Sequence, residues 1–166
     1  MEEIKQENKK EEKTSKSSEK SSQKKDSNMI AVVRISGMVK VREEISHALY
    51  RLRLRRKYSC VLVHSKNNSA KGVLEKVKHY VAYGVIDKKT LVDLIKARGM
   101  SLDKNKINPE KIAEELESGK SLEELGLKPF FRLHPPRKGI KSKLPYPKGV
   151  LGNNREDINK LIERML

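Results

Sequence analysis

The stretch that decides the fold is FFRLHPPRKGIKSK, residues 130–143. Its first four residues, Phe130 to Leu133, form an apolar run long enough for a strand. Pro135 and Pro136 then end any sheet ladder, because proline has no backbone N–H to donate. The cations that follow, with no acidic residue among them, are Arg137, Lys138, Lys141 and Lys143. The stretch therefore predicts a third strand that leads through a stiff turn into a basic arm.

Two more strands and two helices are predicted upstream of this stretch. Residues 29–36 and 58–64 are short, β-branched runs with the alternation expected of strands. Apolar residues from Ile45 to Leu52 recur at helical spacing, and a second helix is predicted from residue 69 to a glycine cap at Gly84. The order predicts an α+β fold. Its core is a small β-α-β-α-β unit in which a three-stranded sheet carries two helices on one face.

The remaining segments fill out the domain organisation. Residues 1–28 are rich in Lys, Glu and Ser, and we expect them to form a disordered tail. Residues 29–86 are the first part of the core, and residues 87–126 are expected to be an insertion of three short helices. Residues 127–166 hold the third strand, the basic arm and a C-terminal helix, which needs an apolar surface of this domain or of a partner.

The net charge of +16 is unevenly distributed over the 166 residues. The tail carries +1, residues 29–86 carry +9, residues 87–126 carry −1 and residues 127–166 carry +7. All of the excess charge therefore lies in two blocks that flank a neutral insertion. Such a distribution matches a polyanionic partner, most simply the phosphates of a nucleic acid.

Several classes of protein are disfavoured by the composition. No apolar run approaches the roughly 18 residues of a transmembrane helix, and the N-terminus has no apolar signal region. The single cysteine, Cys60, fits a reducing compartment. His47, His64, His79 and His134 lack the spacing of metal ligands, and no phosphate-binding or nucleophile motif occurs. We expect no enzymatic activity, no metal and no cofactor.

The few aromatic residues favour one mode of RNA binding. The chain has five Tyr, two Phe and no Trp, and it lacks the motif of sheets that stack single-stranded bases. Binding is therefore expected to rest on phosphates and on the shape of a folded, partly double-stranded RNA. The arm is the main candidate for a phosphate clamp, although a charge run can also be a merely solvated face.

Three separated segments carry a family resemblance. They are VKHYVAYGVIDKKTLVDLIKARG (residues 77–99), PFFRLHPPRKGIK (residues 129–141) and LGNNREDINKLIERM (residues 151–165). These motifs resemble the large-subunit ribosomal protein L-thirty family, in its longer archaeal form that is related to the eukaryotic proteins called L-seven. The likeness covers residues 29–166, and residues 1–28 have no counterpart in it.

The resemblance implies a structural, non-enzymatic protein of the cytoplasmic ribosome, bound to large-subunit rRNA. It also implies neighbouring ribosomal proteins, proximity to 5S rRNA and a single copy in the ribosome. Carried onto this sequence, the candidate RNA-binding residues are Arg51, Arg53, Arg55, Arg56, Lys57, Lys66, Lys71, Arg132, His134, Arg137, Lys138, Lys141, Lys143, Lys148 and Arg155.

Two other functions stay open at this point. A free RNA-binding regulator would share the charge pattern. A protein–protein adaptor would use the neutral helical block and the C-terminal helix. A helix-turn-helix reader of DNA is disfavoured, because its candidate helices lie in the block of charge −1.

Overall fold

One five-stranded sheet organises the chain, for which a computed structural model describes residues 28–102, 108–140 and 142–166. The predicted tail therefore lies outside the described residues except for Asn28. The sheet has the order β4-β2-β1-β3-β5. Its strands are β1 (Met29–Arg34), β2 (Ser59–His64), β3 (Val81–Val85), β4 (Phe131–Arg132) and β5 (Gly152–Asn153). All neighbours are antiparallel except β3 and β5, which are parallel.

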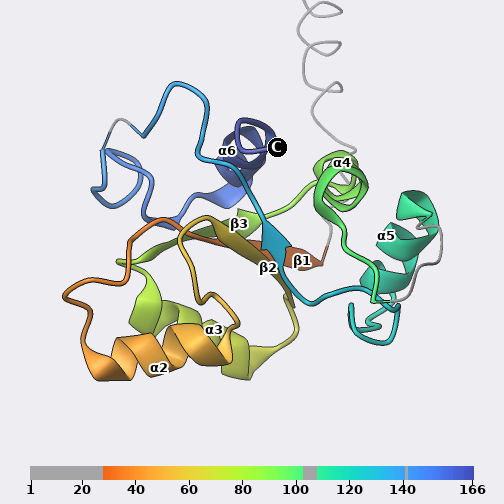
Figure 1. Cartoon of the computed structure of the whole chain (residues 1–166), viewed down its shortest axis with the longest axis horizontal. Coiled ribbons are helices and arrows are strands. Elements are labelled where there is room, and N and C mark those ends of the chain that lie inside the picture. Colours follow the sequence, from red (N-terminus) through yellow and green to blue (C-terminus); the bar gives the residue numbers. More distant parts are fainter. Residues whose placement is uncertain (1–27, 103–107, 141) are drawn as a thin grey trace, which may run out of the picture.

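Helices cover both faces of the sheet (Figure 1). One face carries α2 (Glu43–Arg51) and α3 (Asn68–Val77). The other carries α4 (Lys88–Arg98) and α6 (Ile158–Glu163), with the 3-10 turn η2 (Arg155–Asp157) leading into α6. The helix α5 (Pro109–Glu117) packs beside α4. No described helix combines the length and the apolar character that crossing a membrane requires.

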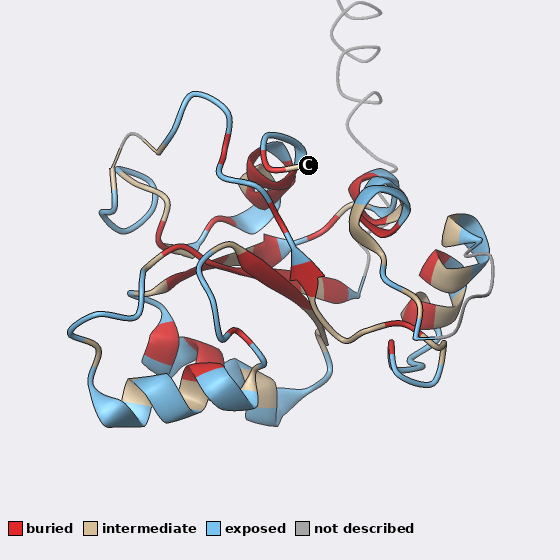
Figure 2. Ribbon diagram, in the orientation of Figure 1, coloured by how far each residue is buried: buried red, intermediate tan, exposed pale blue. Residues whose placement is uncertain are grey.

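The central strand β1 separates two apolar clusters (Figure 2). Ala31, Val33 and Ile35 belong to the cluster under α4 and α6, whereas Val32 belongs to the cluster under α2 and α3. This is the alternation that the sequence predicts for a strand with both faces buried.

The predicted α+β fold is confirmed, but the sheet is larger than expected and its third long strand is a different segment. The run Phe130 to Leu133 supplies only the two-residue edge strand β4, which pairs with Ser59 and Cys60 of β2. The third long strand is β3, which lies directly against β1. The predicted helix 69–84 was therefore wrong in its second half, because α3 ends at Val77.

Gly84 has a role that differs from the predicted helix cap. It lies within β3, where an added Cβ would overlap the backbone carbonyl oxygen of Arg155. The glycine is needed because η2 crosses the strand at this point with no room for a side chain.

In the described part of the block 87–126, two of the three predicted helices are present, α4 and α5. Residues 122–126 form a turn, at whose start the Glu124 carboxylate accepts from the Ser121 N–H and the Ser121 hydroxyl accepts from the Glu124 N–H. Leu91, Leu94 and Ile95 of α4 are fully buried in the cluster shared with α6. Ala113 and Leu116 of α5 belong to the same cluster, so both helices of the block are part of the main core. The C-terminal helix likewise packs on this domain, with Ile158 and Ile162 wholly buried.

Candidate nucleic-acid interface

The topology gathers most of the basic segments at one end of the sheet. At this end β1 and β4 finish and β2, β3 and β5 begin, as the pairings of Arg34 with Val81 and of Arg132 with Ser59 show. The β1–α2 loop, the loop before β2 and the arm between β4 and β5 all start or finish here; we call it the basic end (left in Figure 1). The neutral block leaves from the opposite end, after β3, and returns there before β4.

Arg34 holds two loops of the basic end together. Its guanidinium donates to the carbonyl oxygens of Leu54 at 2.7 Å and Arg55 at 3.2 Å. It also donates to Ser36 at 3.0 Å and Gly37 at 2.8 Å on the β1–α2 loop. The residue is 4% exposed, and burial lowers its pKa below the ordinary value of an arginine. Arg34 is therefore a buried support of the basic surface, and the four carbonyl oxygens compensate the burial of its charge.

The loop supported by Arg34 presents its cations to solvent. Arg53, Arg55, Arg56 and Lys57 are exposed, while Leu54 between them is buried as an anchor. Two of these cations lie over aromatic rings. The Arg55 guanidinium is 4.1 Å from the ring centroid of Tyr50, and the Lys57 ammonium is 4.6 Å from that of Tyr58. These contacts restrict long side chains that would otherwise be free.

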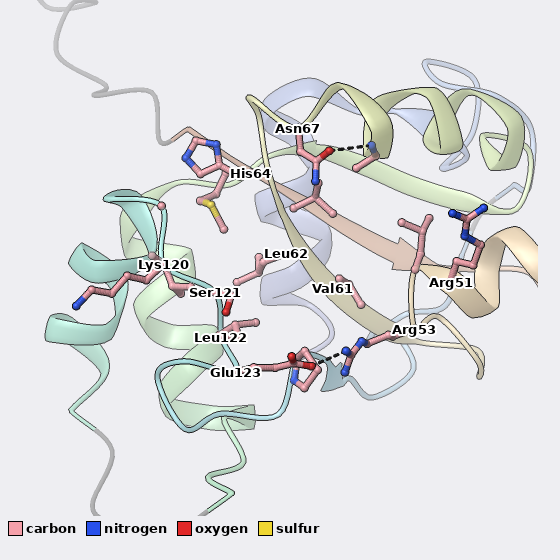
Figure 3. Close-up of a pocket in the computed structure, with 17 residues that line it drawn as sticks. Arg51, Arg53, Val61, Leu62, His64, Asn67, Lys120, Ser121, Leu122 and Glu123 are labelled. Carbon is pink, nitrogen blue, oxygen red and sulfur yellow. Dashed lines mark hydrogen bonds and ion pairs between the residues drawn. The ribbon is translucent and has the colours of Figure 1, made fainter.

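Arg53 differs from its neighbours because it already has an anionic partner. It forms an ion pair with Glu123 of the turn after α5 (Figure 3). Both side chains are 51% exposed, so water weakens the pair and an RNA phosphate can compete for the guanidinium.

Arg132 and His134 extend the surface along the edge strand. Both are exposed, and they flank Leu133, whose N–H donates to Tyr58 at 3.0 Å. The Arg132 guanidinium lies 5.9 Å from the ring centroid of Phe130. The edge strand therefore joins the loop before β2 to the start of the arm.

The start of the arm is clamped to the C-terminal helix. Arg164 donates through Nε and Nη2 to the carbonyl oxygen of Arg137, and through Nη2 to that of Gly139 at 2.7 Å. Lys138 and Gly139 are both left-handed, with φ of 64° and 69°. The proline pair was expected to stiffen this segment, and the clamp adds a tertiary restraint. Lys141 lies outside the described residues.

The rest of the arm folds back before it enters β5. Leu151 donates to the Leu144 carbonyl at 3.1 Å, and Tyr146 donates to the Leu151 carbonyl at 2.8 Å. Gly149 is required in this turn, because an added Cβ would overlap the backbone of Leu144. Lys143 and Lys148 are exposed on this loop, and Lys148 lines the same hollow as Lys138 and Arg164.

The other predicted residues do not join this surface as directly. Lys66 and Lys71 lie at the opposite end of the sheet, in the turn after β2 and at the start of α3. Arg155 is exposed beyond β5, at the edge of the sheet furthest from β4.

Arg51 lines a hollow of about 350 Å³ between α2, the outer edge of β2 and residues 119–123 (Figure 3). Asn67, which caps α3, and Ala70 of α3 also line it. The hollow mixes apolar side chains from β2 with Arg51, Lys120 and Glu123.

The described residues can bind a ligand through their positive charge and through the shape of the surface. They contain no group of three or more His, Cys, Asp or Glu side chains that could hold a metal ion. Burial raises the pKa of the Cys60 thiol to about 12, against a small opposing effect of the Val32 backbone, so the thiol stays protonated at neutral pH. A protonated, inaccessible thiol is a poor nucleophile.

Residues that sequence reasoning missed fall into two groups. Lys40 and Arg42 are exposed on the β1–α2 loop at the basic end, next to Met38 and Val39, which are 64% and 86% exposed. Their signal was available, since both cations lie in the short loop between the first strand and the first predicted helix. Arg34 and Arg164 act through backbone carbonyls distant in sequence, and no local pattern marks such a role.

The chain is similar in sequence to known proteins over most of its length. Residues 30–81 match the family model described as ribosomal protein L30p/L7e. The chain is 42% identical over 152 residues to a protein of Archaeoglobus fulgidus named large ribosomal subunit protein uL30, covering 82% of this chain and 99% of the relative. Proteins of the same name from Desulfurococcus amylolyticus and Nanoarchaeum equitans are 41% and 37% identical, each over 83% of this chain and 98% and 99% of the relative.

Proposed function

Because the chain belongs to the ribosomal protein L30p/L7e family, we propose that it is a structural constituent of the large ribosomal subunit. It binds folded large-subunit rRNA through the basic end of its sheet. The family is structural and non-enzymatic, and its archaeal members share nearly their whole length with this chain. The protein accordingly works in the cytoplasmic ribosome, among rRNA and other ribosomal proteins.

The proposal of rRNA binding rests on one observation. Basic loops whose backbones are held by other residues of the domain converge at one end of the sheet. The loop before β2 is fixed by Arg34, and the start of the arm is fixed by Arg164. Loops that are already ordered lose less conformational entropy when they bind. Cations on such loops can meet several phosphates of a folded RNA at once, and each contact releases counterions.

The predicted residues differ in their position relative to the basic end, and we rank them accordingly. The primary contacts are those at the basic end, namely Arg55, Arg56, Lys57, Arg132, His134, Arg137, Lys138, Lys143 and Lys148. Lys141, outside the described residues, is proposed as a contact from its place in the sequence of the arm. Arg53 contributes less because Glu123 already neutralises part of its charge. Arg51, Lys66, Lys71 and Arg155 form a second, more scattered set that a large RNA can reach around the domain. Proximity to 5S rRNA and a single copy per subunit stay predictions from the family.

One structural fact weakens the alternative of a protein–protein adaptor. That alternative needs the C-terminal helix to offer an apolar face, but Ile158, Leu161 and Ile162 are buried in this domain. A free RNA-binding regulator would use the same basic end, and the two functions differ only in which RNA is bound in the cell.

Sedimentation of the native protein separates these functions. A lysate is fractionated on a sucrose gradient at low magnesium, where ribosomal subunits separate. We expect the protein in the large-subunit fraction, and we expect it to bind deproteinised large-subunit rRNA in a filter-binding assay. Sedimentation with mRNA would support the regulator. Sedimentation with neither, together with a protein partner that binds independently of salt, would support the adaptor.

A further inference from the structure

Tyr50 has an unusual position for a large aromatic residue. It lies in the last turn of α2 and is 57% exposed. Its side chain is absent from the buried clusters on either face of the sheet, although Leu49 beside it is fully buried. The packing of the domain therefore does not account for an aromatic ring at this position.

The orientation of the ring is fixed from one side. The Arg55 guanidinium lies 4.1 Å from the ring centroid, so it covers one face of Tyr50. Arg55 is itself restrained, because its carbonyl oxygen accepts from Arg34 and its loop is anchored by Leu54. The opposite face and the outer edge of the ring are the parts that a ligand can reach.

The surroundings of the ring favour a nucleic acid. Between Arg51 and Lys57 the chain has five cations and no acidic residue. The nearest carboxylates on the same helix are Glu43 and Glu44, two turns earlier, and Glu43 contacts His47 at 3.5 Å. An aromatic face next to several cations is the combination that holds a base and its flanking phosphates.

The type of base follows from geometry. Bases within an A-form helix are stacked on both faces, and their ring surfaces are inaccessible to a side chain. Only an unpaired base, in a loop, a bulge or a single strand, can lie against Tyr50.

We propose that Tyr50 is a base-stacking residue, which receives one unpaired RNA base on the ring face opposite Arg55. This inference rests on the proposed function and deepens it. It also changes the expectation from the sequence, under which phosphates and helical shape alone would carry the binding. With it, the basic end can distinguish an RNA that presents an extruded base from a regular duplex.

The absence of tryptophan from the chain provides a direct probe. The variant Tyr50→Trp places the sole indole at the proposed stacking position, and its fluorescence reports contact with a base. The ligands are a twelve-nucleotide oligoadenylate and the blunt duplex that it forms with oligouridylate. We expect the oligoadenylate to quench the indole strongly and the duplex to quench it weakly.

Substitutions give the second readout. Tyr50→Leu should weaken oligoadenylate binding by about 5- to 150-fold, by the same factor at every salt concentration, because stacking releases no counterions. Tyr50→Phe should bind as the wild type does. Arg55→Gln should instead reduce the salt dependence. The matched control is His47→Leu, one turn earlier on α2 and 74% exposed in its side chain, which should have no effect.

The outcomes separate this inference from the function on which it rests. If the wild type binds deproteinised large-subunit rRNA and oligoadenylate but Tyr50→Leu binds them equally well, Tyr50 only packs against Arg55 and the inference is overturned. Equal quenching by the duplex would also overturn it. If the wild type binds no RNA at all, the proposed function itself fails.

Discussion

Arg34 Nη1 lies 2.7 Å from the carbonyl oxygen of Leu54, twenty residues further along the chain. The bond connects the end of the central strand to the loop that carries the densest group of cations. A buried guanidinium thus supports the backbone of a surface whose other arginines, Arg53, Arg55 and Arg56, are exposed.

Replacing this buried arginine should destabilise the protein. Arg34→Met keeps much of the volume but leaves the carbonyl oxygens of Leu54, Arg55, Ser36 and Gly37 without their donor. We expect the free energy of unfolding to fall by about 2–4 kcal/mol, since hydrogen bonds to charged groups are among the stronger ones. Urea denaturation measures this. Arg56→Met, at an exposed position, is the control and should change stability by less than about 0.5 kcal/mol.

Arg164→Lys tests whether the clamp on the arm matters for binding. Lysine keeps the charge but cannot donate to two carbonyls in the planar geometry of a guanidinium. We expect affinity for deproteinised large-subunit rRNA to fall about two- to tenfold, because the start of the arm must then be ordered on binding. The slope of log affinity against log salt should stay the same. A reduced slope would mean that Arg164 itself contacts phosphate.

Neutralising the arm should reduce the salt dependence of RNA binding. Changing Arg137, Lys138, Lys141 and Lys143 to Gln should flatten the slope by about two to four units if most of them contact phosphate. The fold should be intact in thermal melts, because the described members of this set are exposed.

The matched control removes the same charge from the neutral block, through Lys89, Lys96, Lys111 and Lys120 changed to Gln. These residues are exposed and lie away from the basic end, so the slope should stay close to that of the wild type. Equal slopes for all three proteins would contradict the role of the arm.

Substitution by alanine should change the stability of the protein in opposite directions at two glycines. Gly84→Ala places a Cβ against the Arg155 carbonyl and must separate β3 from η2, so we expect a loss of about 1–3 kcal/mol of stability. Gly72→Ala meets nothing within 4 Å in the middle of α3 and should gain about 0.5–1 kcal/mol. Thermal or urea unfolding of the two variants decides this. A tolerated Gly84→Ala would show that η2 can move away from the strand.

The parts of the fold that could be predicted are those with a local apolar pattern. The alternation from Met29 to Ile35 identified β1 and both of its faces. β3 could not be distinguished from a helix, because Val73, Val77 and Val81 continue the helical spacing of α3 into the strand. Which segment pairs with a given strand depends on contacts between residues far apart in the chain, and a local apolar pattern does not contain that information.

The parts of the site that could not be predicted from the sequence also depend on contacts between distant segments. β5 consists of Gly152 and Asn153, which have no strand propensity, and it forms because the arm returns to the edge of β3. No local pattern marks the role of Arg34, because its four acceptors lie on two loops. No local pattern in the sequence marks Tyr50 either. Its contact with Arg55 depends on how the chain turns after α2.

The two apolar clusters separated by β1 have different consequences during synthesis of the chain. The cluster under α2 and α3 draws its buried members from Val32 to Val81, so it can close once the first half of the protein has been translated. The opposite cluster needs Ile158, Ile162 and Met165, close to the C-terminus. A nascent chain therefore exposes one apolar face of its sheet until translation has nearly ended. Chaperones have access to that face during this interval, and a chain truncated before α6 should be prone to aggregation.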